Sequence, residues 1–173
     1  MKSESRSNAE VFIGLGANLG TPRQTFELAL ALIGRFAKVH SVSKLYRSLP
    51  FGYADQPPFI NAAACIATDL EPEPLLAKMK DVEGALGKEV ICENGPRVID
   101  IDLLLYDDQS IDSENLTLPH PAILSRDFVI RPLLDLNSAL QHPSWGAKTL
   151  KSALGGLQKK FVVDEPETWN LRS

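Results

Sequence analysis

The period of hydrophobic and polar positions changes several times along the first part of the chain, and each change marks a new element. Alternation with a period of two, or a short apolar run between turn residues, predicts a strand, whereas apolar positions three and four apart predict a helix. By these criteria, strands are predicted at residues 11–16, 38–46, 59–70 and 98–106. Helices are predicted from Pro22 to about Gly34 and over residues 71–86, where Gly87 ends the second one.

The order of these elements predicts the fold class, α/β of the α+β kind. Strand-helix-strand-strand-helix-strand is a ferredoxin-like β-α-β-β-α-β core, an antiparallel sheet with helices packed on it and one face or edge left for a ligand. Residues 107–118 predict a hairpin or loop, and residues 119–132 a proline-bounded segment with short helical turns. Residues 133–172 form a C-terminal extension with a predicted helix at residues 149–155.

Composition narrows the class of protein. With 173 residues, 44% of them hydrophobic and 23% charged, the chain is long enough for a substantial core. We expect a frayed or disordered N-terminus over residues 1–10 and one domain over residues 11–173. A formal net charge of -4 argues against a general nucleic-acid binder, and no apolar run is long enough to span a bilayer. Cys65 and Cys92 form no disulfide framework, which suits a cytoplasmic location.

A pair of carboxylates stands at the start of the last predicted strand. Side chains alternate along a strand, so Asp100 and Asp102 point to one face and Ile101 to the other. Like charges one strand repeat apart repel each other, and a divalent cation would remove that repulsion. The alternative is a solvated strand end with Arg97 as an ion-pair partner. The spacing alone leaves both interpretations open.

The glycine-rich stretch Gly14-Leu15-Gly16-Ala17-Asn18-Leu19-Gly20 invites comparison with nucleotide-binding loops. Its spacing is GxGxxxG, one residue longer than the dinucleotide fingerprint, and no acidic residue follows at the required distance. It also lacks the Gly-Lys-Ser/Thr of a P-loop. We therefore interpret these glycines as parts of a tight strand-to-helix turn.

Two further groups are candidates for binding. His120 lies between two prolines, and with Lys88, Arg97 and the aspartates it would make a polyphosphate site, although a surface-loop role for the histidine is an equal alternative. Phe59 and Asn61 would suit a flat heterocycle, the ring by stacking and the amide by hydrogen bonding. Ordinary core packing is the alternative for Phe59.

These stretches together resemble one family, the 6-hydroxymethyl-7,8-dihydropterin pyrophosphokinases of folate biosynthesis. The resemblance covers roughly residues 11–136, and its motifs occur in the family's order. They are Ile13-Gly14-Leu15-Gly16-Ala17-Asn18-Leu19-Gly20, Leu45-Tyr46-Arg47-Ser48, Asp55-Gln56-Pro57-Pro58-Phe59-Ile60-Asn61, Gly95-Pro96-Arg97 with Asp100-Ile101-Asp102, and Leu118-Pro119-His120 with Arg126-Asp127-Phe128.

The resemblance implies an ATP- and Mg²⁺-dependent diphosphokinase that transfers pyrophosphate from ATP to 6-hydroxymethyl-7,8-dihydropterin and releases AMP. It implies a ferredoxin-type fold whose mobile loops close over two Mg²⁺ ions held by Asp100 and Asp102. Arg97 and Lys88 would contact the transferring phosphates. The partners implied are these small molecules, with no nucleic acid or membrane, and a monomer is compatible with them.

The resemblance also implies which residues hold each substrate. The residues implied for ATP are Glu83, Thr117, His120 and Arg126. Those implied for the pterin are Ser48, Leu49, Phe51, Gly52, Phe59, Asn61 and Phe128. Phosphoryl-type transfer can proceed by positioning and electrostatics, so no general base is named, and one aspartate could assist in removing the proton.

The loop over residues 88–94 departs from the family pattern. The family usually carries several arginines there, whereas this loop has one lysine and two glutamates, and Lys88 stands where an arginine is usual. A lysine lacks the bidentate fork of an arginine. Two other functions therefore stay open: a catalytically weak pterin- or nucleotide-binding module, and a metal-dependent phosphohydrolase that uses the two aspartates without a pterin pocket.

Overall fold

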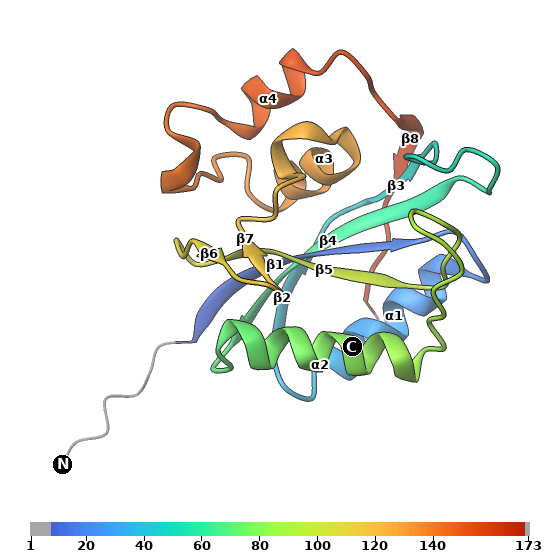
Figure 1. Cartoon of the computed structure of the whole chain (residues 1–173), viewed down its shortest axis with the longest axis horizontal. Helices are drawn as coiled ribbons and strands as arrows, with labels where there is room; N and C mark the ends of the chain where they lie inside the picture. Colours follow the sequence, from blue (N-terminus) through green and yellow to red (C-terminus); the bar gives the residue numbers. More distant parts are fainter. Residues whose placement is uncertain (1–7, 172–173) are drawn as a thin grey trace.

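The computed structural model describes residues 8–171 and places a six-stranded antiparallel sheet at the centre of the chain (Figure 1). The strands of this sheet are β1 (Ala9–Ala17), β2 (Lys38–Val42), β3 (Leu45–Ser48), β4 (Phe59–Thr68), β5 (Asp100–Tyr106) and β8 (Val162–Glu167). Their order is β5-β1-β4-β3-β8, and β2 pairs with β4 beside β3. A separate ribbon is made by β6 (Ile111–Asp112) and β7 (Thr117–Leu118).

Helices cover both faces of the sheet (Figure 1). They are α1 (Pro22–Ile33), α2 (Pro72–Ala85), α3 (Asp127–Leu136) and α4 (Leu150–Gly156), with short 3-10 turns at Ile123–Ser125 and Pro143–Trp145. The order from β1 to β5 confirms the predicted ferredoxin-like core, and the short β6–β7 ribbon confirms the predicted hairpin. Within residues 8–171, no helix has the length and apolar character needed to cross a bilayer.

The alternating side chains of the strands divide the core between the two faces. The face under α1 and α2 buries Val11, Ile13, Leu15, Ala62, Ala64, Ile66, Ile101 and Leu103 against Phe26, Ile33, Leu75 and Met79. The opposite face buries Phe12, Ala63, Cys65, Leu104 and Leu105 against Ile130, Leu133 and Leu150 of α3 and α4. Because α3 and α4 cover only part of this second face, the ends of β1, β4 and β5 beyond them are open to a ligand.

A bulge in β5 explains the change of face within its apolar run. Phe12 pairs with Leu105 and Ile13 pairs with Leu103, so Leu104 is an extra residue with no partner of its own in β1. An extra residue turns the following side chains to the other face. Leu104 and Leu105 therefore both enter the core under α3, and Asp100 and Asp102 keep a common face before the bulge.

The structure corrects three predicted elements. The strand predicted over residues 38–46 is two strands, because Ser43 bonds to Ala63 through its backbone N–H and its hydroxyl, while the Lys44 N–H donates to the Asp135 carboxylate. The region from Pro119 holds more than short turns, since α3 runs for ten residues with Pro132 inside it. The predicted tail contains an unforeseen strand, β8, which pairs with β3.

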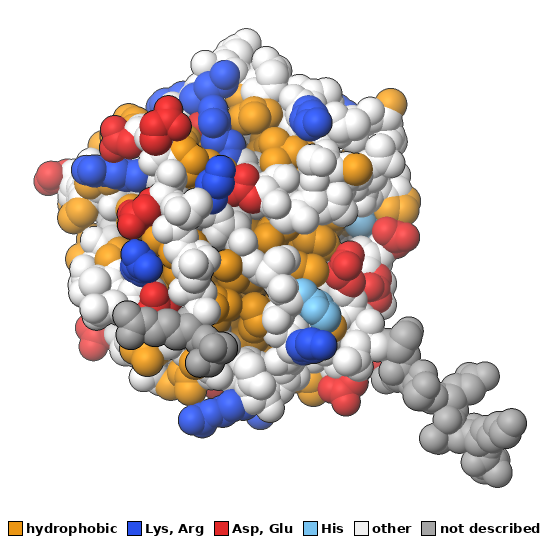
Figure 2. Space-filling model, turned by 180° about the vertical axis from the view of Figure 1, so that it is seen from behind, with side chains coloured by type: hydrophobic (Ala, Val, Ile, Leu, Met, Phe, Trp, Pro, Cys, Tyr) orange, Lys and Arg blue, Asp and Glu red, His pale blue; other side chains and the backbone are white. Residues whose placement is uncertain are grey.

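The ends of the chain bear on the remaining predictions. Most of the predicted N-terminal segment, residues 1–10, lies outside the described residues, but Ala9 and Glu10 already belong to β1. The helix predicted at residues 149–155 is confirmed as α4. On the described part of the face shown in Figure 2, Lys and Arg side chains are interspersed with Asp and Glu side chains.

Candidate active site

The open part of the second sheet face forms the floor of a cavity beside α3. Gly14 pairs with Asp102 in β5, and Gly16 pairs with Asp100 in β5 and with Asn61 in β4. Directly paired residues of antiparallel strands share a face. All five residues line the cavity. The sheet register therefore places the two carboxylates and the amide on opposite sides of a floor made of glycine.

This placement corrects our interpretation of the glycine-rich stretch. Gly14 and Gly16 lie inside β1 and not in a turn; only Gly20, with φ of +67°, serves the turn that leads into α1. A Cβ on Gly16 would meet only the Asn61 Oδ1 atom, at 3.7 Å, and would project into the cavity. Gly16 keeps its part of the floor clear of side chains, whereas the Leu104 side chain packs over Gly14.

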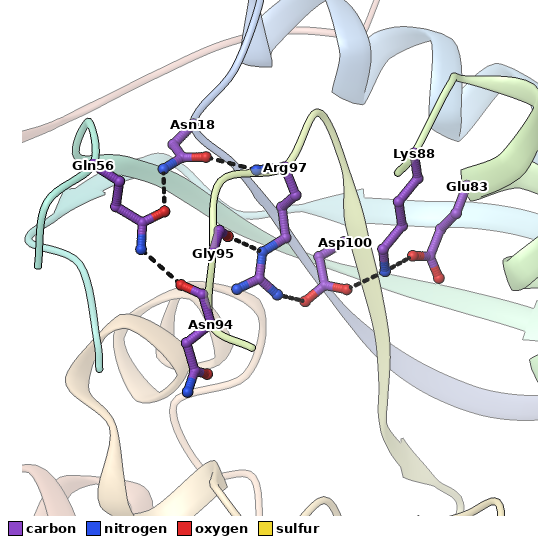
Figure 3. Close-up of polar contacts among 8 residues, drawn as sticks. All are labelled: Asn18, Gln56, Glu83, Lys88, Asn94, Gly95, Arg97 and Asp100. Atoms are coloured by element: carbon purple, nitrogen blue, oxygen red, sulfur yellow. Dashed lines mark hydrogen bonds and ion pairs between the residues drawn. The ribbon is translucent and has the colours of Figure 1, made fainter. Parts of the chain in front are cut away.

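Asp100 is held between two cations (Figure 3). Arg97 Nη1 lies 3.0 Å from one carboxylate oxygen, and Lys88 Nζ lies 2.8 Å from the other. Lys88 also makes a close ion pair with Glu83 of α2. All four side chains are largely buried, so these pairs are screened less by solvent than surface ion pairs. The loop over residues 88–94 is thereby tied to α2 and β5.

Asp102 makes no comparable ion pair with any residue that the structure describes. Burial, and after it the neighbouring carboxylates of Asp100 and Glu83, raise the pKa of its carboxyl from the ordinary 3.8 to about 7, against the opposing effect of Lys88 and Arg97. A buried carboxylate beside another carboxylate is a destabilised group that a divalent cation would stabilise. Hard oxygen donors of this kind suit Mg²⁺, which takes one or two carboxylates together with phosphate oxygens and water.

The donor set therefore fits Mg²⁺ with only two protein ligands. Among the described residues, no group of three or more His, Cys, Asp and Glu side chains is placed to hold a metal ion. An ion bound by Asp100 and Asp102 would complete its coordination with substrate oxygens and water, which is the usual arrangement at phosphate-handling sites.

Asn18 and Gln56 join three loops at one side of the cavity (Figure 3). The Asn18 amide donates to Gln56 Oε1 and to the Pro57 carbonyl, both at 2.9 Å, and its own Oδ1 accepts from the Arg97 N–H at 2.9 Å. Gln56 Nε2 donates to the Asn94 carbonyl at 2.7 Å. The turn after β1, the loop over residues 49–58 and the loop before β5 are thus held together by two side-chain amides.

Asn61 presents a single polar atom to the cavity. Its Nδ2 donates to the Ser48 hydroxyl at 2.8 Å and to the Tyr46 carbonyl at 3.2 Å, which occupies both of its N–H groups. The remaining Oδ1 faces Gly16 on the cavity floor. Asn61 is buried, so this oxygen is an acceptor fixed in orientation and suited to a ligand that offers N–H donors.

Aromatic rings surround this acceptor. Phe59, Phe51 and Phe128 line the cavity. The guanidinium of Arg97 lies over the Phe59 ring at 5.3 Å, and that of Arg126 lies 4.2 Å from the Phe51 centroid and 5.9 Å from the Phe128 centroid. Apolar rings with cations against them make a slot for a flat, electron-rich ring.

A second cavity lies on the other side of the aspartates. It is lined by Leu76, Lys80, Glu83, Lys88, Asp100, Asp102, Asn115, Thr117 and His120, among others. His120 lines both cavities, and so do the two aspartates. Burial and the nearby Arg126 lower the pKa of His120, and its Nδ1 accepts the Ala122 N–H at 3.1 Å, so the neutral ring carries its proton on Nε2.

The structure brings most of the predicted site residues together in these two cavities. Ser48 and Leu49 line the first cavity, whereas Gly52, with φ of +81°, lies against the Asn94 side chain and does not line it. Arg126 lines the first cavity and not the second, away from Glu83 and Thr117.

Sequence reasoning missed the hub formed by Asn18 and Gln56. Both residues lie inside motifs that resemble the family. The sequence around an amide side chain does not indicate a hydrogen-bond partner 38 residues away. Lys80 and Asn115, which line the second cavity, were missed as well. The helical position of Lys80, one turn before Glu83 on α2, could have indicated it.

Fold and site together define a class: a ferredoxin-like α/β enzyme whose sheet carries paired carboxylates and cations between two cavities, one lined by aromatic rings. The profile of the 7,8-dihydro-6-hydroxymethylpterin-pyrophosphokinase (HPPK) family matches residues 12–138. The chain belongs to this family.

Curated relatives agree with this assignment. The chain is 39% identical over 135 residues to the 2-amino-4-hydroxy-6-hydroxymethyldihydropteridine pyrophosphokinase of Haemophilus influenzae, covering 77% of this chain and 84% of that protein. It is 34% identical over 160 residues to the enzyme of the same name from Bacillus subtilis, covering 91% and 96%. It is 41% identical over 148 residues to the folic acid synthesis protein fol1 of Pneumocystis carinii, covering 84% of this chain.

Some relatives are much longer than this chain. The match spans only 20% of the Pneumocystis carinii protein. Among solved structures, a Plasmodium falciparum HPPK-DHPS variant with pterin and p-hydroxybenzoate superimposes with a TM-score of 0.71 at 16% identity, covering 89% of this chain and 44% of that one. At that identity the superposition shows the fold.

Proposed function

We propose that this chain transfers pyrophosphate from ATP to the hydroxymethyl group of 6-hydroxymethyl-7,8-dihydropterin, giving AMP and the pterin diphosphate in folate biosynthesis. The observation that carries the proposal is the pair Asp100 and Asp102, which lines both cavities and separates an aromatic slot from a site with cations. Membership of the family supports the same reaction. In that reaction the alcohol oxygen attacks the β-phosphorus, the bond between that phosphorus and the oxygen bridging it to the α-phosphate breaks, and AMP leaves.

The first cavity would hold the pterin. Its ring would lie between Phe59 and Phe128, and its N–H donors would reach the fixed Oδ1 of Asn61. The backbone and side chains of Ser48, Leu49 and Phe51 would close the slot. Both N–H groups of Asn61 are already hydrogen-bonded, so only its fixed oxygen is available to a ligand. This oxygen favours a heterocycle that offers donor groups over one that offers acceptors.

The second cavity would hold the nucleotide against Glu83, Thr117 and His120, with Arg126 reaching it from the first. Asp100 and Asp102 would hold two Mg²⁺ ions, which when bound neutralise charge on the ATP phosphates. The Nε2–H of the neutral His120 would donate to a phosphate or ribose oxygen. The residues of the chain contribute positioning and charge, and we assign no general base.

Lys88 and Arg97 would serve the phosphates by changing partners. Both cations bind Asp100, and Lys88 also binds Glu83. With Asp100 committed to a divalent cation, Arg97 would be free to donate to phosphate oxygens, and Lys88 would have N–H donors left beyond the one that binds Glu83. Arg97 offers a bidentate fork and Lys88 a single point charge, so the larger share of phosphate binding falls to Arg97.

We propose further that residues 11–173 work as one cytoplasmic pyrophosphokinase domain with ATP and the pterin as its partners, an arrangement compatible with a monomer. Two observations support a reducing compartment and one unit: both cysteines are free thiols, and Phe161 near the C-terminus packs against Phe51 and Phe128 of the first cavity.

AMP formation from ATP and Mg²⁺, with and without 6-hydroxymethyl-7,8-dihydropterin, tests the proposal. We expect AMP only when the pterin is present, and none after chelation of Mg²⁺. Binding without turnover would instead support a binding module, and phosphate release without pterin would support a phosphohydrolase. Asp112→Asn on the exposed β6 is the matched control for charge loss and should leave the rate unchanged.

A further inference from the structure

The first cavity has an outer wall that comes from the C-terminal extension. Phe161, just before β8, does not line the cavity but lies behind two residues that do. Its ring centroid is 5.5 Å from that of Phe51 and 5.9 Å from that of Phe128, the second contact being edge-to-face at 90°. Phe161 is 8% exposed, so nearly all of its surface is buried.

Phe161 is fixed in place by a carboxylate that the proposed mechanism does not use. Asp127, the first residue of α3, is fully buried, and its two oxygens accept the Phe161 N–H at 3.0 and 2.9 Å. One of them also accepts the Val162 N–H at 2.9 Å. A buried carboxylate of this kind is retained only when hydrogen bonds satisfy it, and here the donors come from the start of β8.

The same segment also holds the loop on the other side of the cavity. The Leu49 N–H donates to the Phe161 carbonyl at 2.8 Å, which extends the β3–β8 ladder to the first residue of that loop. Lys159 Nζ lies 5.0 Å from the centroid of the Phe161 ring. One residue of the tail therefore contacts both walls of the slot, the Leu49–Phe51 side and the Phe128 side.

We infer that Phe161 and Asp127 are positioning residues for the heterocycle. Phe161 sets the distance and the angle between Phe51 and Phe128, and Asp127 fixes Phe161 against both. The inference deepens the proposed function and rests on it, since the heterocycle is the proposed pterin. It assigns to the C-terminal extension, which lies beyond the part of the chain matched by the family profile, a direct share in the pocket.

The second cavity should be largely independent of this wall. Neither Phe161 nor Asp127 lines it, and Glu83, Thr117 and His120 take part in none of these contacts. Arg126, which stacks on Phe51 and Phe128, is the link between this wall and the proposed nucleotide site. Loss of Phe161 should therefore weaken the binding of the pterin much more than that of ATP. A purely structural role would lower both affinities together or neither.

Two variants and a matched control test the inference. Phe161→Leu removes the ring but keeps an apolar side chain, and Asp127→Asn leaves one oxygen and places an N–H group against the backbone donors. Phe26→Leu is the control, because Phe26 is also buried in an edge-to-face pair, with Trp169, but on the opposite face of the sheet. Calorimetry would measure the affinity for 6-hydroxymethyl-7,8-dihydropterin, with a non-hydrolysable ATP analogue present, and separately for that analogue.

We expect both variants to bind the pterin about three- to tenfold more weakly, the value of one or two aromatic contacts, with a clearly smaller loss of affinity for the ATP analogue. Phe26→Leu should lower the melting temperature and leave both affinities unchanged. A folded Phe161→Leu variant with wild-type pterin affinity would overturn the inference, as would an equal loss for both ligands. If the wild-type protein itself binds no pterin, the proposed function fails, and that outcome is distinct from either of these.

Discussion

Asp102 is the residue at which stability and function are most directly opposed. Its carboxyl is buried beside Asp100, which raises its pKa to about 7. A raised pKa means that the folded state holds the proton more tightly than the unfolded state. The corresponding stabilisation is fully present below about pH 4 and is lost as the pH rises through about 7. At neutral pH the metal-free protein therefore carries an unfavourable charge that suits a cation site.

Asp102→Asn removes this charge at constant shape. We expect the metal-free variant to melt a few degrees higher than the wild type at pH 8, with the difference vanishing near pH 4, because there the wild-type carboxyl is already neutral. Magnesium-dependent AMP formation should fall by more than about 100-fold, since even residues behind metal ligands cost 10- to 100-fold. Thermal melts in EDTA and the AMP assay measure both effects; a normal rate would refute the assignment of the metal ligand.

Substitution of Phe128 should show which of the two cavities binds the pterin. It lines the first cavity and not the second. Phe128→Ala should weaken pterin binding by about tenfold or more, the worth of a lost ring stack, and weaken ATP binding much less. Phe36→Ala, on the opposite core, is the control for general loss of packing. Calorimetry that found the ATP affinity reduced more than the pterin affinity would place the pterin elsewhere.

At the scale of elements, alternate residues of β1 serve the hydrophobic core and the cavity. Val11, Ile13 and Leu15 fill the core under α1 and α2, while Gly14 and Gly16 lie on the open face. The strand is held by pairing on both of its edges, with β4 and β5, so it tolerates two glycines that would weaken an edge strand.

Gly16→Val tests whether the glycine floor serves ligands. A β-branched residue suits a strand, and the space above Gly16 is free up to Asn61, so we expect the melting temperature to stay within about 2 °C of the wild type. Binding of both substrates should fall by more than about tenfold, because the side chain would occupy the cavity beside Asp100. Unaltered binding would show that the ligands do not approach the floor.

Gly84→Ala is the matched glycine variant. Gly84 lies inside α2, and a Cβ there would meet nothing within 4 Å. The change should stabilise the fold by about 1 kcal/mol, since alanine is the better helix former, and leave both affinities unchanged.

At the scale of the whole molecule, the C-terminal segment passes around an edge of the sheet and joins its two faces. β8 pairs with β3 at the edge of the sheet (Figure 1). Before this strand, Phe161 packs behind the first cavity, and after it Trp169 is buried in the core under α1. The Trp169 indole N–H donates to the Ser43 carbonyl at 2.7 Å, and its ring packs edge-to-face on Phe26. The tail is therefore part of the folded core on one side and of the proposed pterin pocket on the other.

Trp169→Ala should destabilise the whole molecule. The loss of a buried ring costs about 3–5 kcal/mol, which corresponds to a fall in melting temperature of roughly 10 °C or more. Trp169→Phe should lose less, since it keeps most of the packing. At a temperature where both variants remain folded, both substrate affinities should be near the wild-type values. A melting temperature unchanged by the alanine variant would show that the tail is not part of the cooperative core.

The sequence by itself determined the ferredoxin-like order of elements and the common face of Asp100 and Asp102, because both follow from local periodicity. It could not determine what depends on register and on contacts across the chain. The glycines of β1 look like turn residues until pairing with β5 places them on a cavity floor. The ten-residue α3 was hidden by Pro132, and β8 by a proline and acidic residues that an edge strand tolerates. The hub of Asn18 and Gln56, and the clamp of Asp127 on Phe161, exist only when distant loops meet. Tertiary structure decided these contacts, because the identity of a hydrogen-bonding residue does not indicate which distant residue it will contact.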